Sequence, residues 1–139
     1  MTQEHKDMLM KDLSARLPYH VKVEIDLQSN IYPPMTCEVC NIEFTEMGGS
    51  FVGVWVLPDS YCEYREFLCK PYLFPMSSMT EEQENEYVAT FVTIVYEDGS
   101  RDTTMTCESF DWLNKHMFDY RGLIQLGLAK DATGLGIYS

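Results

Sequence analysis

Two cysteines, Cys37 and Cys40, have the spacing of one half of a zinc site, because thiolates separated by two residues often bind zinc together. A complete site would need two more ligands, and the candidates are scattered singly along the chain: Cys62, Cys69, Cys107 and His116. On an extended strand, Cys37 and Cys40 would also point to opposite faces. The five cysteines are odd in number, and residues 1–10 lack the apolar core of a secretion signal. We therefore expect reduced, packed thiols and no metal or other cofactor.

Cys107 and His116 could in principle act as a nucleophile and its base, since a helix N-terminus can lower the pKa of a thiol. They would lie at opposite ends of one short helix, about 12 Å apart at the standard rise, which is too far for a direct hydrogen bond. The chain also has no glycine-rich phosphate loop, nucleophile elbow or paired-histidine zinc motif. We therefore expect a non-enzymatic protein with no catalytic residues.

The strongest compositional feature is acidity, with 22 Asp and Glu against 10 Lys and Arg and a net charge of −12. This charge repels phosphate backbones, so direct binding to nucleic acid is disfavoured and basic proteins are favoured as partners. Four acids fall on one predicted helix: Glu81, Glu82, Glu84 and Glu86. They form either a solvated face that keeps the protein soluble or a contact surface for a basic partner.

Residues 109–128 interleave large aromatic side chains with charged ones, a mixture that predicts a segment docked in one geometry. Arg121 in this segment could bind an anionic ligand. We favour a structural ion pair with Asp119 or Asp111, which would fix how the last helix docks.

A second hypothesis places a small ligand, such as a nucleotide, in a pocket lined by aromatic residues of 72–74 and 118–120. The side chains concerned include Tyr72, Phe118 and Tyr120. The chain would then be a ligand-binding protein or an enzyme, and a deep pocket in the structure would favour this hypothesis over a flat acidic contact surface.

The length of 139 residues fits a single domain over residues 1–139, and 45% apolar residues suffice for one hydrophobic core. No apolar run approaches the roughly 18 residues of a membrane span. We expect a cytoplasmic protein without membrane contact, and the sequence leaves homo-oligomerisation open.

The N-terminal half shows helical spacing followed by strand alternation. Leucines four residues apart predict a helix that Pro18 ends, and alternation of apolar and polar residues predicts the first strand. A hairpin follows across Gly48-Gly49, and Gly53 in its second strand suggests a bulge or a close neighbour. The predicted elements are a helix over 2–17, a strand over 20–27, a loop over 28–35, and strands over 38–44 and 51–57 that Pro58 and Asp59 end.

The C-terminal half is more mixed. Residues 61–69 fit either helical turns or an edge strand, and the two prolines in 70–79 predict an irregular segment. Thr80 and Gln83 have the spacing of a capping box. Residues 88–106 are predicted to form a hairpin around Asp98-Gly99, and the alternative for this segment is a continued helix. Two short helices should follow, one from a Ser109 cap to about Met117 and one from Asp119 to about Gly127. Residues 132–139 should form a surface tail.

These elements predict an α+β fold: a single domain with an N-terminal helix, a mainly antiparallel sheet, and short C-terminal helices packed on one face. The charged and aromatic residues of 109–128 would then serve chiefly to close the core.

Three segments resemble a family of small uncharacterised proteins of bacteriophages and prophages of gut Bacteroidetes. They are DLSARLPYHVKVEID (residues 12–26), KPYLFPMSSMTEEQ (70–83) and ESFDWLNKHMFDYRGLIQLGLA (108–129), a little over a third of the chain. The resemblance extends neither to the cysteines of 30–69 nor to residues 88–107. It brings no catalytic residue or cofactor, and it implies an accessory role inside an infected bacterium.

Acidity, missing catalytic motifs and the resemblance together favour a phage accessory protein that binds a host protein, such as a defence or nucleic-acid-handling factor. The candidate interaction residues are Glu81, Glu82, Glu84, Glu86, Tyr72, Phe118, Tyr120 and Arg121.

Overall fold

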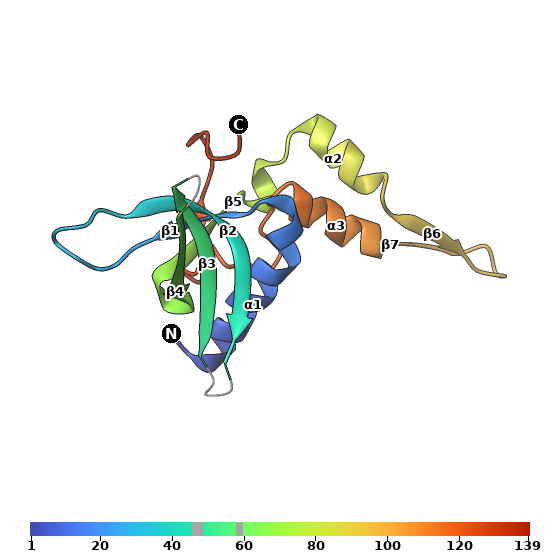
Figure 1. Cartoon of the computed structure of the whole chain (residues 1–139). Coiled ribbons are helices and arrows are strands. Elements are labelled where there is room, and N and C mark those ends of the chain that lie inside the picture. The colour runs from blue at the N-terminus through green and yellow to red at the C-terminus, as the bar shows by residue number, and fades with distance from the viewer. Residues whose placement is uncertain (46–48, 58–59) are drawn as a thin grey trace.

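One helix and one mainly antiparallel sheet form the centre of the computed structural model, which describes residues 1–45, 49–57 and 60–139. The six-stranded sheet has the order β4-β3-β2-β1-β5-β8, and α1 packs against one of its faces (Figure 1). The strands are β1 (Lys22–Ile25), β2 (Met35–Phe44), β3 (Ser50–Leu57), β4 (Ser60–Arg65), β5 (Cys69–Leu73), β6 (Val92–Val95), β7 (Arg101–Thr104) and β8 (Lys130–Asp131). The helices are α1 (Gln3–Arg16), α2 (Glu81–Val88) and α3 (Cys107–Lys115), with 3₁₀ turns η1 (Leu17–Tyr19), η2 (Glu66–Leu68) and η3 (Met76–Ser78). The predicted α+β fold is confirmed.

The first helix and strand follow directly from the sequence pattern. Thr2 caps α1 by accepting a hydrogen bond from the His5 N–H, and the helix buries Leu9 and Leu13 completely. Val23 and Ile25 alternate inward along β1 and are also fully buried. The predicted helix and strand are therefore confirmed, because their apolar stripes meet in one core.

The predicted hairpin is formed by β2 and β3, which pair from Glu38 opposite Trp55 to Phe44 opposite Ser50. Gly48 in its connection, and Pro58 and Asp59 after it, lie outside the described residues. Gly53 has a close neighbour, as one of the two alternatives predicted, since a Cβ there would meet the ring of the exposed Tyr61 side chain at less than 3 Å. Both alternatives for residues 61–69 occur in part, because the edge strand β4 runs directly into η2.

The prediction that residues 70–79 are irregular is wrong for its first part, because Cys69–Leu73 form strand β5. This strand pairs antiparallel with β1 and, through Tyr72 and Leu73 alone, parallel with β8. Pro71 precedes the two residues that pair with β8, so the sheet edge beside it is open and the missing N–H is tolerated there. β8 has only two residues and carried no strand pattern of its own.

The acidic helix and the hairpin that follows it are confirmed. Thr80 and Gln83 form the capping box of α2, which ends at Val88. β6 and β7 then form a hairpin around Asp98-Gly99, with Gly99 in the left-handed region at φ +85°. The alternative of a helix continuing past Phe91 is wrong.

Two details of the C-terminal region differ from the predictions. Thr106 caps α3, and Ser109 is the third helical residue that completes its capping box. Residues 120–127 form turns and no helix. Asp119 holds these turns, because its two carboxylate oxygens accept hydrogen bonds from the N–H groups of Leu123 and Ile124, each at 2.9 Å.

A buried ion pair joins α1 to the C-terminal segments. The side chains of Asp12 and Arg16 are both fully buried, and Arg16 Nε lies 2.9 Å from Asp12 Oδ2. The same guanidinium donates to the carbonyl oxygens of Phe118 at 2.6 Å and Leu113 at 3.4 Å. Arg121 adds a second cation, with Nε 3.3 Å from Asp12 Oδ1. A buried charge is tolerated only when it is partnered in this way, so these contacts fix α3 and residues 118–121 against α1.

We predict that Asp12→Ala lowers the free energy of unfolding by about 3–5 kcal/mol, because it leaves the buried Arg16 guanidinium without its carboxylate. Urea unfolding followed by circular dichroism measures this loss. The control is Asp7→Ala on the exposed side of the same helix, which should change stability by no more than about 0.5 kcal/mol. Equal losses in the two variants would contradict the buried pair.

A second buried carboxylate, Glu66, joins the other end of α1 to the sheet. Its Oε2 accepts a hydrogen bond from the Ser50 N–H at 3.1 Å, and its Oε1 lies 3.5 Å from Lys6 Nζ. Burial acts to raise the pKa of Glu66, but hydrogen bonds from the Glu66 and Ser50 N–H groups and the charge of Arg65 outweigh it and lower the pKa below the usual value. Nothing in the sequence pattern had indicated a buried acid at this position.

Because the pKa of Glu66 is lower in the folded than in the unfolded protein, its carboxylate stabilises the fold above about pH 4.3, the unfolded pKa of Glu. That contribution is lost as the pH falls through the folded pKa. We predict that Glu66→Gln lowers the free energy of unfolding by about 1–2 kcal/mol at pH 7. The difference in free energy of unfolding between the variant and the unmodified protein should become smaller as the pH falls. Urea unfolding between pH 7 and pH 3 tests this, and a difference independent of pH would contradict it.

Candidate functional site

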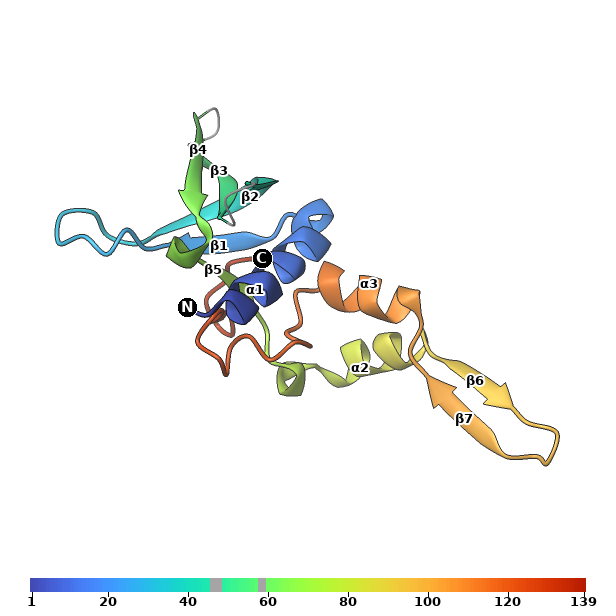
Figure 2. The ribbon, with the colours of Figure 1, turned by 90° about the horizontal axis from the view of Figure 1, so that it is seen from below.

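A protruding arm, defined as residues 80–106, carries α2 and the β6–β7 hairpin away from the core (Figures 1 and 2). Among the described residues, β6 and β7 pair with each other and with no other strand, and every residue of both strands is exposed. A two-stranded hairpin with no third strand or helix packed on it is only marginally stable in water. The hairpin therefore has two unpaired edges and two open faces available to a partner.

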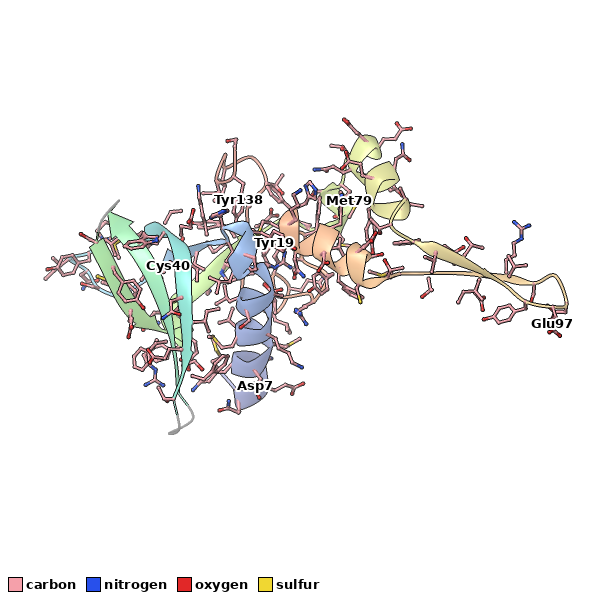
Figure 3. All side chains as sticks on the ribbon, turned by 45° about the vertical axis from the view of Figure 1, so that its right-hand side comes forward. Asp7, Tyr19, Cys40, Met79, Glu97 and Tyr138 are labelled. Carbon is pink, nitrogen blue, oxygen red and sulfur yellow. The ribbon has the colours of Figure 1, made fainter. Side chains whose placement is uncertain are left out.

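The exposed side chains of the hairpin include large apolar ones. Val95 is 61% exposed, Val92 47%, Tyr96 46% and Ile94 44%. Val92, Ile94 and Tyr96 alternate along the chain and so share one face of the hairpin. Side chains project from both faces out to the tip, where Glu97 is labelled in Figure 3. Contiguous exposed apolar side chains of this kind mark binding surfaces.

The base of the arm is anchored to α3 by hydrogen bonds and ring stacking. The Thr106 hydroxyl donates to the Thr90 carbonyl oxygen at 3.0 Å, and the Thr90 hydroxyl donates to the buried Ser109 hydroxyl at 2.7 Å. Tyr87 of α2 stacks on Trp112 of α3 with ring centroids 5.5 Å apart. The arm is thus held firmly where it leaves the core and is unsupported beyond that point.

The arm is also the most acidic part of the chain. Residues 80–106 hold seven of the 22 acidic residues and one of the ten basic ones, so they carry −6 of the net charge of −12. Glu81, Glu82, Glu84 and Glu86 are all exposed, as expected for either interpretation of the acidic helix. Such a concentration of one charge attracts a surface of the opposite charge and makes binding sensitive to salt.

The other candidate residues lie elsewhere and do not form one site. Tyr72 and Phe118 are buried in the core, at 6% and 2% exposure. The Tyr120 hydroxyl donates to Asn114 Oδ1, and the guanidinium groups of Arg16 and Arg121 lie 5.4 Å and 4.9 Å from the centre of its ring. Arg121 is in a structural ion pair as favoured, but its partner is Asp12 and not Asp119 or Asp111.

The aromatic residues of 72–74 and 118–120, for which the sequence suggested a pocket, include two that pack on each other. Phe74 and Phe118 pair with each other through an isolated backbone bridge and a ring contact, with centroids 6.1 Å apart. Phe74 also lines a cavity, which is formed with the C-terminal tail.

The five cysteines differ in how deeply they are buried, and burial raises the pKa of the deepest thiols. Cys37 and Cys69 are buried, Cys40 and Cys62 are partly exposed, and Cys107 is exposed. Burial raises the pKa of Cys69 to about 12 and also raises the pKa of Cys37, so both thiols stay protonated at neutral pH. Within residues 1–45, 49–57 and 60–139, no three His, Cys, Asp or Glu side chains are placed to hold one metal ion.

No protein-family model, curated protein or solved structure gives a significant match to this chain. None of the described helices combines the length and the apolar composition that crossing a membrane requires.

The sequence predicts the acidic helix and the hairpin as separate elements. The sequence could not show that they share one protruding arm. A short run of β-branched residues gives the same pattern whether the strand is buried in a core or exposed to solvent.

Proposed function

We propose that this chain is a non-enzymatic accessory protein that binds a basic protein partner through the arm of residues 80–106. The observation that carries the proposal is the β6–β7 hairpin, whose apolar side chains and unpaired edges face solvent in the most acidic part of the chain. Apolar area provides affinity, and the surrounding acids select the partner and speed its approach.

Charge favours a basic partner over a second copy of this chain. Two copies joined arm to arm would bring together 14 acidic residues and two arginines, since each arm has seven acids and Arg101. Like charges placed opposite one another across an interface oppose association. A basic protein surface gains from the same charges, and nucleic acid is repelled by them.

The open edges of the hairpin suit strand addition, in which an extended segment of the partner pairs with β6 or β7. Backbone hydrogen bonds then provide affinity, and side chains on alternate positions provide specificity. The face formed by Val92, Ile94 and Tyr96 would contact apolar side chains of the added strand, while α2 presents its glutamates to basic residues nearby.

The resemblance to phage and prophage proteins suggests where the partner occurs. The proposal is that the protein acts in the cytoplasm of a Bacteroidetes host, on a host protein whose basic surface normally binds nucleic acid or a defence component. An acidic arm would compete for such a surface because it presents the same sign of charge as a phosphate backbone.

Affinity capture from a lysate of a gut Bacteroidetes strain tests the proposal with three variants. The first replaces the four glutamates of α2 by glutamine, and the second is the hairpin pair Ile94→Thr and Val95→Thr. The control removes four exposed acids outside the arm: Glu4→Gln, Asp7→Asn, Asp26→Asn and Glu43→Gln. All substituted residues are exposed, so each variant should fold.

We predict that the unmodified protein and the control enrich the same basic protein, and that both arm variants lose about tenfold or more of it, as expected when contacts worth more than 1.4 kcal/mol are removed. The captured amount should also fall with added salt. Equal capture by all variants, or capture of no protein above background, would contradict the proposal.

A further inference from the structure

A cavity of about 690 Å³ lies between the C-terminal tail, the end of α3, and the segment that joins α1 to β1. Its size is typical of sites for small ligands. Tyr19 and Tyr138, both labelled in Figure 3, belong to its wall.

The wall of this cavity is less acidic than the chain as a whole, because it has two lysines and one acidic side chain. The lysines are Lys22 and Lys115, and His20 and His116 add two imidazoles. Burial, with a smaller effect of Lys115, lowers the pKa of His116, so this imidazole serves as a neutral hydrogen-bonding group. The single acid in the wall, Glu38, already lies 3.3 Å from His20 Nδ1. In a protein with a net charge of −12, a cavity with this composition is suited to an anion.

The aromatic part of the wall is rigid. The Tyr138 hydroxyl accepts a hydrogen bond from the Lys22 N–H at 2.9 Å and donates to the Tyr72 carbonyl oxygen at 2.8 Å. Lys22 Nζ donates to the Ile137 carbonyl oxygen at 2.8 Å, which ties the tail to β1. With Tyr19 and Phe74, the fixed Tyr138 ring offers apolar surface on which a flat ring can pack.

His20 adds an independent observation. It ends η1 in the left-handed region at φ 64°, where glycine is the least strained residue. The His20 side chain is 77% exposed, and its Nδ1 lies 3.3 Å from Glu38 Oε2. Met117 also lines the cavity with φ 60°, but it is buried in the core, which accounts for its side chain. Exposed Gln28 has φ 56° as well and does not line the cavity, so the backbone of His20 is no signature of a ligand by itself. What His20 contributes is a largely exposed imidazole in the cavity wall.

We propose that this cavity binds a small anion that carries a flat ring, of the class of a nucleoside monophosphate. Lys22 and Lys115 attract the phosphate, His20 donates to it, and the ring packs against Tyr19 and Tyr138. Lys22, Lys115, His20 and the two tyrosines all lie outside the arm, although Gln83 of the arm also reaches the cavity wall.

Isothermal titration with AMP and UMP tests the proposal, with adenosine and inorganic phosphate as the partial ligands. Nucleotide binding should be weakened about tenfold or more by Lys115→Gln, which removes one contact to a charged group. Lys11→Gln, at an exposed lysine outside this cavity, should leave it unchanged. His20→Gly should raise the melting temperature by relieving the backbone, and should nevertheless weaken binding.

The proposal is overturned if neither nucleotide binds at millimolar concentration, if adenosine or phosphate alone binds as tightly as the nucleotides, or if Lys115→Gln binds like the unmodified protein. The hairpin variant with Ile94→Thr and Val95→Thr changes no residue of the cavity wall and should bind nucleotide normally, so failure of the arm proposal and failure of this one are distinguishable.

Discussion

The fold depends on one buried ion pair, Asp12 with Arg16. The Arg16 guanidinium has partners in α1, at the end of α3 and at residue 118, so one side chain connects segments about a hundred residues apart in sequence. Burying these charges is costly unless every partner is in place. We therefore expect α1, the end of α3 and residue 118 to pack together as a unit or not at all. Arg121 joins the same carboxylate and extends the constraint to the turns that Asp119 holds.

Both proposed sites are positioned by α3, which this network fixes. At its N-terminal end, Thr106 and Ser109 hold the base of the acidic arm. At its C-terminal end, Lys115 and His116 form one wall of the tail cavity. The core therefore presents two different surfaces: an exposed acidic hairpin, for which we propose a protein partner, and a cavity with two lysines in its wall, for which we propose a small anion. Neither site requires the chain to carry out a reaction.

Periodicity and turn chemistry were sufficient to predict much of the fold. The leucine spacing of α1, the alternation in β1 and the Asp98-Gly99 turn each report a local preference that the core reinforces. The buried network could not be predicted, because an Asp and an Arg four residues apart are typical of a solvated helix face. Strand β8 and the tail cavity depend on contacts between distant segments, which local patterns do not encode.

Hydrogen exchange of backbone amides tests most directly whether the arm is an exposed binding unit on a rigid core. In the isolated protein, amides of β6 and β7 should exchange far faster than those of α1 and β1, because nothing but their own pairing protects them. Addition of the captured basic partner should slow exchange in residues 92–104 and leave α1 unchanged. Hairpin amides as slow as those of α1 before any partner is added, or protection that appears outside the arm, would contradict this account.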